Sequence, residues 1–518
     1  MADLVKSQKP VVRWRGNRIV SNAKYDAGTL GTGRSRNWDS TDYGPNSILS
    51  SQLETLRNRS RIATRNNPWI FQAIERLVSN EVGVGVTLSS GCKKESFQKQ
   101  MDALWDEHKN FLDFYGNIPF GGIQQQSVRG RRVSGEVFIQ KVRVKHNSPL
   151  PLPFQIIVHE SDMVPVQLNQ DLSNGNVIRQ GIEFNKQRRK VAVWFWTNHP
   201  KEQAFSSSVY SADQFTRVPA REVIHHFDST MRPGQIRGEP NSARSLVSAI
   251  TFDSYEDAEL TRKQTRAPFT GVVTRPEYSE EDFVFDPFTG DSLDTEGGVT
   301  PVNATPGTFL NTFPGETVTL FDGDNTGQGF KDYTKMVLLK IAAGYGMPYE
   351  MLSGDWAGVN DRLVRAIVNE FRRQLEAAQD HLLIFQICRG VWRWGVESAI
   401  ATGRIRAADF WSKRDFYLPV IARPHAWEYV NPEQDVNTKI KLMNNRLASR
   451  KSVSDSMPGP SIEEIDRQIE QDDFKAVYSA SGGASAKPSV SESRDDPGSV
   501  DKTDDQSDNH ENEEMTDE

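Results

Sequence analysis

The segment from Gly344 to Ile367 (GYGMPYEMLSGDWAGVNDRLVRAI) combines four glycines and a proline with the start of a long amphipathic pattern. Glycine-rich turns that open a helix are places where backbone N–H groups bind nucleotide phosphates, so the segment is first tested as a nucleotide site. An ATP-binding loop of that kind needs a Gly-Lys pair, and none occurs in the 518 residues. The glycine spacing also differs from the dinucleotide-binding pattern. The segment therefore predicts a hinge between two helices, not a phosphate site.

Other residue types that could bind a metal or act in catalysis are scattered. Nine histidines and two cysteines, Cys92 and Cys388, show no metal-ligand spacing and cannot form a disulfide framework. His225 and His226 are adjacent on a predicted strand and would point to opposite faces, which favours a structural role over a shared metal. A hydrolase or nuclease remains the competing hypothesis, but no motif places an acidic pair beside a histidine or serine. We expect no enzymatic activity and no cofactor.

Three arginines, Arg57, Arg61 and Arg65, are spaced four residues apart in the segment SILSSQLETLRNRSRIATRNNP (47–68). This spacing places them on one face of a predicted helix. The arginine stripe has two interpretations: either a solvated face or salt bridges between subunits, or contact with phosphate groups. The sequence leaves both open. The apolar face of the same helix is predicted to consist of Leu49, Leu53, Leu56 and Ile62.

Composition restricts the class of protein. A chain of 518 residues with 36% hydrophobic residues is long enough for two or more globular domains. The net charge is −7, of which −10 lies in residues 491–518, so the rest of the chain is close to neutral. A dedicated duplex-binding domain is usually strongly basic. No apolar run approaches a membrane span and residues 1–16 lack a signal-peptide core, so we expect a cytoplasmic product that does not enter a membrane.

The remaining patterns predict an α+β fold. Short β-branched and aromatic segments separated by Asn, Gly and Pro run from Val82 to Asp228, without regular βαβ alternation. Asn67-Pro68 predicts a helix start. Helices are predicted at 243–267 and 331–344, with Gly344 ending the second as a C′ glycine and Asn360 capping the next. That next helix carries a long apolar stripe of Val364, Ile367, Phe371, Leu375, Ala378, Leu382 and Phe385.

The order of four motifs resembles the portal proteins of lambda-like tailed phages, from about Tyr25 to Ser479. The motifs are RSRIATRNNPWIFQAIERLVSNEVGVGVTL, RPGQIRGEP (232–240), GYGMPYEMLSGD and RPHAWEYVNPEQDVNTKIKLMNNRLASRKSV. Any one alone is weak, and the four in order are specific. This chain departs from the family where an Asn-aromatic-Ser-Ser run is usual: it has VNDRLVRA, which keeps Asn360 and Arg365 but lacks the serines.

The resemblance implies a homo-oligomeric ring, typically of twelve subunits, at one capsid vertex. Double-stranded DNA would slide through this ring without sequence-specific contacts during packaging and ejection. The implied partners are the terminase large subunit, the major capsid protein and head-completion or connector proteins. The implied location is the virion, with assembly in the host cytoplasm. Another ring-forming capsid or baseplate component is the alternative.

The resemblance also implies a division of the chain into named segments. The hinge would include a tunnel loop in the DNA channel, with Trp356 as a bulky tip, although a packed turn with Trp356 buried is the other interpretation. The loop residues are Gly354, Asp355, Trp356, Gly358, Asn360 and Arg362. The segments are a basic arm (1–45), a strand-rich wing (46–240), stem helices (241–267 and 331–344), a clip (268–330), the hinge and tunnel loop (345–361), a long spoke helix (362–395), a wing return and helical crown (396–480), and a disordered acidic tail (481–518).

Overall fold

The structure is a computed structural model that falls into two compact units, residues 1–431 and 432–518. Residues 1–41 of the predicted basic arm, the whole acidic tail and most of the predicted clip lie outside the described residues. No helix in the described part is long and apolar enough to cross a membrane. The structure describes residues 42–145, 148–202, 214–266, 271–274, 317–320, 326–425, 432–455 and 462–471.

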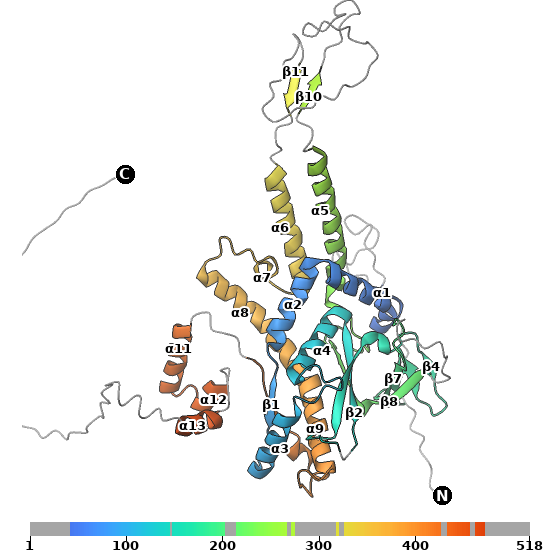
Figure 1. Cartoon of the computed structure of the whole chain (residues 1–518), viewed down its shortest axis with the longest axis vertical. Coiled ribbons are helices and arrows are strands. Elements are labelled where there is room, and N and C mark those ends of the chain that lie inside the picture. The colour runs from blue at the N-terminus through green and yellow to red at the C-terminus, as the bar shows by residue number, and fades with distance from the viewer. Residues whose placement is uncertain are drawn as a thin grey trace, which may run out of the picture. The chain divides into compact units, whose positions relative to one another are not determined.

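Two consecutive helices, α1 (Pro45–Asn66) and α2 (Pro68–Val82), open the described chain (Figure 1). The Asn67 side chain accepts a hydrogen bond from the Ile70 N–H at 2.9 Å, and Pro68 occupies the first turn of α2. Proline is preorganised for that position and lacks the N–H that would be left without a partner. The helix start predicted at Asn67-Pro68 is therefore confirmed. The residues turned inward from α2 are those the sequence predicted: Ile70, Ile74, Leu77 and Val78.

Two antiparallel sheets and further helices make the first unit a mixed α+β structure, as predicted. One sheet has the order β3-β2-β9 and the other the order β4-β5-β6-β7-β8. Two further strand pairs are β1 (Thr87–Ser90) with β12 (Val420–Arg423) and β10 (Gly271–Thr274) with β11 (Thr317–Leu320). The other elements are α3 (Glu95–His108), α4 (Phe120–Ser134), β2 (Glu136–Arg143), β3 (Phe154–Glu160), β4 (Gln170–Asp171), β5 (Val177–Arg179), β6 (Ile182–Phe184), β7 (Lys190–Trp196), β8 (Phe215–Pro219), β9 (Val223–Phe227) and α10 (Arg414–Tyr417).

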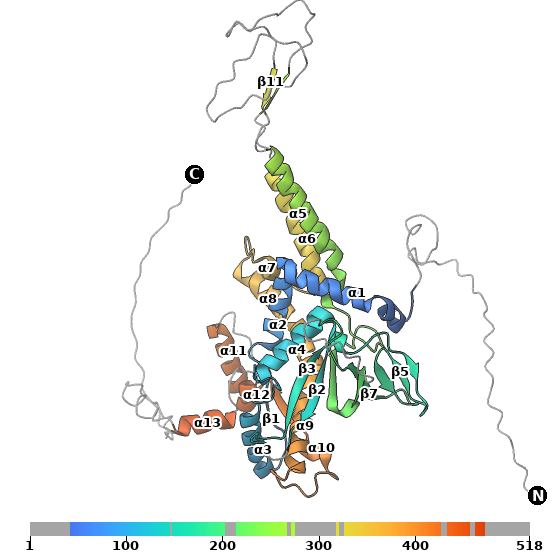
Figure 2. The ribbon, with the colours of Figure 1, turned by 45° about the vertical axis from the view of Figure 1, so that its right-hand side comes forward.

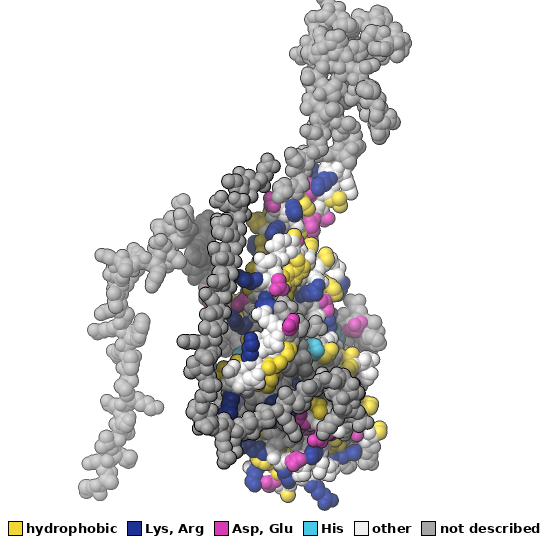
Figure 3. All heavy atoms as spheres, turned by 90° about the vertical axis from the view of Figure 1, so that its left-hand side faces the viewer, with side chains coloured by type: hydrophobic (Ala, Val, Ile, Leu, Met, Phe, Trp, Pro, Cys, Tyr) yellow, Lys and Arg dark blue, Asp and Glu magenta, His cyan; other side chains and the backbone are white. Residues whose placement is uncertain are grey.

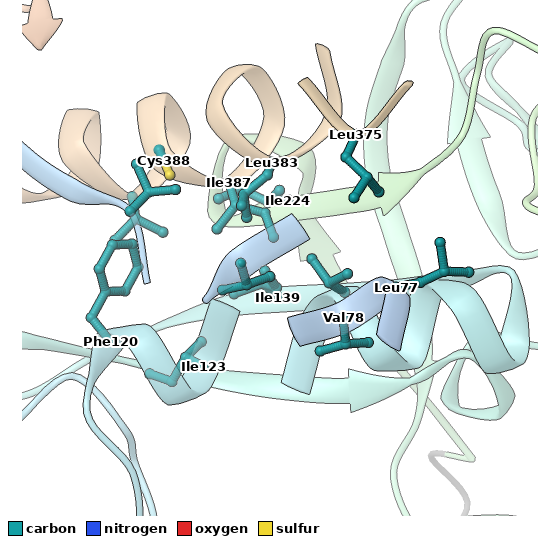
Figure 4. Packing of buried hydrophobic residues seen from close by; sticks show 14 of the residues in the cluster. Leu77, Val78, Phe120, Ile123, Ile139, Ile224, Leu375, Leu383, Ile387 and Cys388 are labelled. Atoms are coloured by element: carbon teal, nitrogen blue, oxygen red, sulfur yellow. The ribbon is translucent and has the colours of Figure 1, made fainter. Parts of the chain in front are cut away.

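A long continuous helical run packs over this core. It consists of α8 (Asp361–Ala378), a π-helical segment (Gln379–Cys388) and α9 (Arg389–Ala401). Figure 4 shows side chains of the run facing those of α2, α4, β2 and β9. The close-up labels Leu77, Val78, Phe120, Ile123, Ile139, Ile224, Leu375, Leu383, Ile387 and Cys388. Together they form one apolar core.

The π-helical segment corrects the predicted apolar stripe. Phe371, Leu375 and Leu382 are buried as expected, but Phe385 is 61% exposed. A π-helix closes its hydrogen bonds one residue later than an α-helix, so the side chains beyond Ala378 change phase relative to a 3.6-residue period. Leu383 and Ile387 consequently point into the core where the sequence pattern placed Phe385.

The helices α5 (Leu246–Arg266) and α6 (Thr326–Tyr345) form an antiparallel hairpin, and Figures 1 and 2 show them side by side from two directions. At its base the Ser245 hydroxyl donates to the Ile341 carbonyl at 3.2 Å. Higher up, the Tyr255 ring lies 4.5 Å from that of Tyr333 and 5.9 Å from that of Phe330. The two helices predicted on either side of the irregular insertion are therefore present and packed together.

The sequence predicted that Gly344 would end this helix, and that prediction is wrong. The helix α6 continues to Tyr345, and the left-handed residue is Gly346, with φ of 70°. The N–H groups of Gly346 and Met347 donate to the carbonyls of Ala343 and Ala342, the two-bond arrangement common at helix C-termini. Gly344 serves a different purpose, because a Cβ added there would lie 2.0 Å from Ser245 Oγ.

We therefore expect Gly344→Ala to destabilise the hairpin by about 1–3 kcal/mol, the usual cost of overpacking. An alanine would otherwise favour the helix, so the sign of the effect reports the close approach to Ser245. Thermal unfolding of the single variants and of Gly344→Ala with Ser245→Ala measures the coupling. The second substitution removes the Oγ that the new methyl group meets and should recover part of the loss. Equal melting temperatures for wild type and Gly344→Ala would contradict the expectation.

The described residues of the second unit form three short helices, α11 (Pro432–Asn444), α12 (Arg450–Asp455) and α13 (Ile462–Gln471). An ion pair between Arg450 and Asp466, with 2.5 Å between Nη2 and Oδ1, joins α12 to α13. Both side chains are largely exposed, so the pair fixes orientation more than it stabilises.

Candidate functional site

The predicted loop connects the short helix α7 (Tyr349–Ser353) to α8. Gly354 ends α7 with φ of 71°, and Gly358 has φ of 76°. Side chains disfavour this left-handed backbone, which explains glycine at both positions. No atom lies within 4 Å of a Cβ added at either glycine, so packing does not require them. The glycines therefore set the path of the loop.

The described hydrogen bonds of the loop are local. The N–H of Asp355 donates to Ser353 Oγ at 3.1 Å, and the N–H of Ala357 donates to Asp355 Oδ1 at 3.0 Å. The Asn360 side chain accepts from the Leu363 N–H at 2.9 Å, which confirms Asn360 as the cap of α8. Loops held mainly by local bonds open at low free-energy cost, so this one can move while α8 stays fixed.

The tip of the loop is exposed on the single chain. Trp356 is 39% exposed, and Asp355, Gly358 and Arg362 are exposed as well. This exposure contradicts the interpretation in which Trp356 is buried in a packed turn of its own chain. An exposed tryptophan at the tip of a glycine-flanked loop is available to a partner outside the subunit.

The predicted arginine stripe separates into three environments. Arg57 lies on the buried face of α1 with Leu49 and Leu53, and neither solvent nor a phosphate group reaches it. Arg61 is half-buried and pairs with Glu160 and Asp162 of its own chain. Arg65 alone is exposed.

The apolar face predicted for the same helix needs a matching correction. Ile62 is exposed, and Ser60 and Ala63 take the inward positions beside Arg57. A polar group can occupy the buried face when it finds a partner there. The Ser60 hydroxyl does so by donating to the Val133 carbonyl at 2.6 Å.

Arg57 belongs to a buried ion-pair network centred on Glu136, at the start of β2. Arg57 Nη2 lies 2.9 Å and Arg237 Nη2 lies 2.7 Å from Glu136 Oε1. The other carboxylate oxygen accepts from His225 Nε2 at 2.8 Å and from the Gly238 N–H at 3.1 Å. Burial alone would raise the pKa of Glu136, but Arg237, His225 and Arg57 hold that pKa far below its usual range. The carboxylate is therefore ionised and fully paired.

The Glu136 network joins segments that are distant in sequence. It ties α1 to β2 and β9 and to the motif RPGQIRGEP, which contains Arg237. Arg237 also donates to the carbonyls of Gln180 at 2.7 Å and Val164 at 3.2 Å. The network thus gives that motif a structural role. The motif is visible in the sequence, but Glu136 is not predicted from it. The signal for Glu136 is a charged residue at the start of an apolar strand (EVFI).

A second buried cluster ties α2 to α4 and to the π-helical segment. Glu81 lies 2.5 Å from both Arg131 Nη2 and Arg132 Nη2. The Gln379 side chain donates to the backbone carbonyl of Glu81 at 2.7 Å. The core beneath the loop-bearing helix is therefore fixed by charge pairs as well as by apolar packing.

The adjacent histidines of β9 contact different partners. His225 contacts Glu136, and His226 Nδ1 lies 2.9 Å from Gln386 Oε1 on another element, so the structural role predicted for the pair is confirmed. Elsewhere in the described residues, Glu160, Asp162 and His199 place possible ligand atoms within 4.8 Å of one another. Burial alone would raise the pKa of Asp162, but Lys201, Arg57 and Arg61 pair with this carboxylate and lower its pKa. A cation would therefore compete with three basic side chains.

The comparison that decides the family is a match of residues 31–379 to the phage portal protein, lambda family. The chain belongs to this family. The match includes the hairpin, the hinge, the exposed loop and all of α8, so the resemblance inferred from the four motifs is confirmed. The lambda portal family is one of structural proteins.

Relatives of this portal chain carry the same designation. A probable portal protein of Halomonas phage phiHAP-1 is 26% identical over 457 residues, covering 85% of this chain and 83% of the relative. Portal protein B of Escherichia phage lambda is 20% identical over 383 residues, covering 67% of this chain and 69% of the relative. The portal protein of Escherichia phage N15 is 20% identical over 405 residues, covering 71% and 73%.

Solved structures with a similar chain come from gene transfer agent (GTA) particles. A chain in the neck of an empty particle, computed with C6 symmetry, has a TM-score of 0.45 and 11% identity. A chain in the neck of a native particle, computed with C12 symmetry, has a TM-score of 0.44 and 11% identity. Each match covers 79% of this chain and 94% of the other. The family assignment rests on sequence and not on these distant folds.

Proposed function

We propose that this protein forms a closed homo-oligomeric ring of about twelve subunits at one capsid vertex, and that double-stranded DNA passes through the ring during packaging and ejection. The observation that carries this proposal is the family match over residues 31–379, which contains the hairpin, the hinge and the exposed loop. The protein would act as a structural conduit and not as an enzyme. Its location would be the portal vertex of the virion.

The parts of the chain take functional names in this proposal. Residues 241–267 and 331–344, which include α5 and most of α6, form the proposed stem, residues 268–330 the clip, and residues 345–361 the hinge and tunnel loop. The sheets and helices of residues 46–240 form the wing, residues 362–395 the spoke helix, and residues 396–480 the wing return and crown. The clip would dock the terminase large subunit and later the connector proteins, and the wing would meet the major capsid protein.

Charge supports a conduit more than a tight DNA-binding protein. Each basic contact to duplex phosphate adds a salt-dependent binding term, and a ring through which DNA slides gains nothing from gripping it. Outside residues 491–518 the chain carries a net charge of only +3. Arg65 is the member of the arginine stripe that remains available for phosphate or for a neighbouring subunit.

The loop residues proposed to face the channel are those predicted from the family resemblance. Trp356 would be the bulky tip, and Gly354 and Gly358 would let the loop change conformation around moving DNA. Its exposure in the single subunit and its lack of long-range hydrogen bonds among the described residues support this role. The residues are Gly354, Asp355, Trp356, Gly358, Asn360 and Arg362.

We expect the purified protein to form large discrete species of one stoichiometry, because a heterologous interface repeated by rotation must close into a ring or extend as a filament. Mass photometry and negative-stain microscopy measure this directly, the latter through a central channel. A stable monomer at micromolar concentration, with no larger form when capsid protein is added, would contradict the proposal. A ring that never enters heads would favour the alternative of another ring-forming structural component.

A further inference from the structure

Lys190 begins strand β7 of the five-stranded sheet and contacts His225 on β9 of the three-stranded sheet. Its Nζ lies 3.1 Å from His225 Nδ1 and 5.0 Å from the centre of the Phe227 ring. Lys190 is an exposed residue, whereas the His225 side chain is only 6% exposed. The amine of an exposed lysine is therefore bonded to the same imidazole that contacts the buried Glu136.

The contact with Glu136 fixes the hydrogens of this imidazole. The ionised Glu136 carboxylate can only accept, so His225 Nε2, at 2.8 Å from it, carries a hydrogen. Burial and the positive charge of Lys190 lower the pKa of His225 to about 3, so the ring is neutral at pH 7. A neutral imidazole has one hydrogen, which leaves Nδ1 as an acceptor. The Lys190 amine therefore donates to His225 Nδ1.

These three side chains have the arrangement that activates a nucleophile. The Lys190 amine is within hydrogen-bond reach of a neutral imidazole, and a carboxylate fixes that imidazole from its other nitrogen. An amine attacks a carbonyl carbon only after losing a proton, and ordinary lysines are protonated at pH 7. Burial of its nitrogen lowers the pKa of Lys190 to about 8, with Arg237 acting in the same direction and Glu136 against it. A larger share of this amine is therefore neutral.

Local contacts distinguish Lys190 from the other lysines. On the face in Figure 3, Lys and Arg side chains are scattered among other types over the described residues and form no single basic patch. Lys186 is exposed in the turn just before β7. Burial also lowers the pKa of Lys141 to about 8, but this residue is only partly exposed and donates to Ser398 Oγ at 3.0 Å. Lys186 and Lys141 thus serve as two references for Lys190.

We propose that Lys190 is a covalent modification site that takes an activated acyl group, with His225 as the residue that positions its amine. The Nζ lone pair forms a bond to the acyl carbon of a donor such as an acyl phosphate. The bond from that carbon to the leaving oxygen breaks, the leaving group keeps the electron pair, and water takes the extra proton from nitrogen. The product is a neutral amide with one N–H left to donate to His225 Nδ1. The site loses one positive charge and keeps its contact.

Competitive labelling of the full-length protein with a trace of acetic anhydride tests the site. Mass spectrometry gives the labelled fraction of each lysine as the pH is varied. Labelling of Lys190 should rise with a midpoint at about pH 8 and exceed that of Lys186 by about tenfold at pH 7. Lys141 should react more slowly than Lys190 at every pH because it is less exposed. Equal labelling of Lys190 and Lys186 at pH 7 would overturn the proposal, and so would faster labelling of Lys141.

His225→Phe tests the positioning role. Phenylalanine keeps an aromatic ring between Phe138 and Phe227 but has no nitrogen to hold the amine. The released Lys190 side chain can then extend into water. Its labelling at pH 7 should fall about tenfold, and its pH profile should move to higher pH.

Lys141 is the internal control for this variant, because its profile should stay unchanged as long as the sheet around it is folded. An unchanged Lys190 profile in folded His225→Phe would overturn the positioning role of the imidazole. The comparison of Lys190 with Lys186 in the wild-type protein decides the site itself, whether or not the variant folds.

Discussion

Replacing Glu136 with glutamine is expected to lower the free energy of unfolding by about 3–5 kcal/mol, the usual cost of removing one partner from a buried ion pair. The change leaves the guanidinium groups of Arg57 and Arg237 buried at 2.9 and 2.7 Å from an amide in place of a carboxylate. Glutamine has nearly the same shape, so the loss reports charge and not a cavity. Because the network joins α1, β2 and β9, we expect one cooperative shift of the unfolding transition of these elements.

Denaturant unfolding at fixed protein concentration measures this effect, since oligomerisation itself changes apparent stability. The matched control is Glu370→Gln, which removes an exposed pair with Arg373 and should leave the midpoint unchanged. If Glu136→Gln unfolds at the same denaturant concentration as the wild type, the network contributes specificity and not stability.

The pH dependence of the same variant has a definite sign. In the folded chain the pKa of Glu136 lies below its ordinary value of 4.5. A lowered carboxyl pKa stabilises the folded state above the unfolded-state value, and this stabilisation is lost as the pH falls. The difference between wild type and Glu136→Gln should therefore be full at pH 7 and shrink below about pH 4.5.

Local signals in the sequence predicted local structure correctly. Asn67-Pro68 begins α2 and Asn360 caps α8, because each of these signals acts through hydrogen bonds or backbone angles within four residues. Arg57 was assigned outward because a charge on a helix is usually solvated. Its partner Glu136 lies 79 residues further along the chain, and no periodic pattern carries that information.

The long helix shows a second limit of sequence reasoning. A 3.6-residue period continues through Phe385 in the sequence, and the structure leaves that period at Gln379 because the π-helical segment fits Leu383 and Ile387 to the core. Gly344 and Gly346 illustrate the same limit of sequence reasoning. Both are plausible helix ends by residue type, and contact with Ser245 decides which one stays inside the helix.

The role of the loop is the part of the candidate site that neither pattern nor packing settles. Its cap and its glycine angles follow from the sequence, and its exposure follows from the fold. What it contacts depends on a central channel that exists only in the proposed ring. A functional test therefore has to separate ring assembly from DNA movement.

Trp356→Ala is expected to leave ring assembly and subunit stability intact while reducing the yield of heads that hold full-length DNA by about tenfold, as loss of ~1.4 kcal/mol from a retention equilibrium would do. A buried tryptophan would instead cost about 3–5 kcal/mol on truncation and disturb folding. Because Trp356 is exposed, we do not expect this loss of stability. Trp411→Ala is the matched control, because Trp411 is also exposed but lies outside the loop.

Gly358→Pro should produce the same separation by a different physical route. Proline fixes φ near −65°, whereas Gly358 has φ of 76°, so the loop must adopt another path and loses freedom to move. Gly403→Pro is the control, since Gly403 has φ of 71° in an open turn elsewhere and no atom lies within 4 Å of a Cβ added there.

Rings counted by negative stain and packaged DNA measured by nuclease protection give the two readouts. If heads carrying either loop variant fill and retain full-length genomes like the two controls, the loop does not act on DNA, whatever its position in the ring. If Gly358→Pro blocks ring formation while Gly403→Pro does not, the loop is an assembly contact, because a channel-facing tip would be free to change its path without loss of the ring.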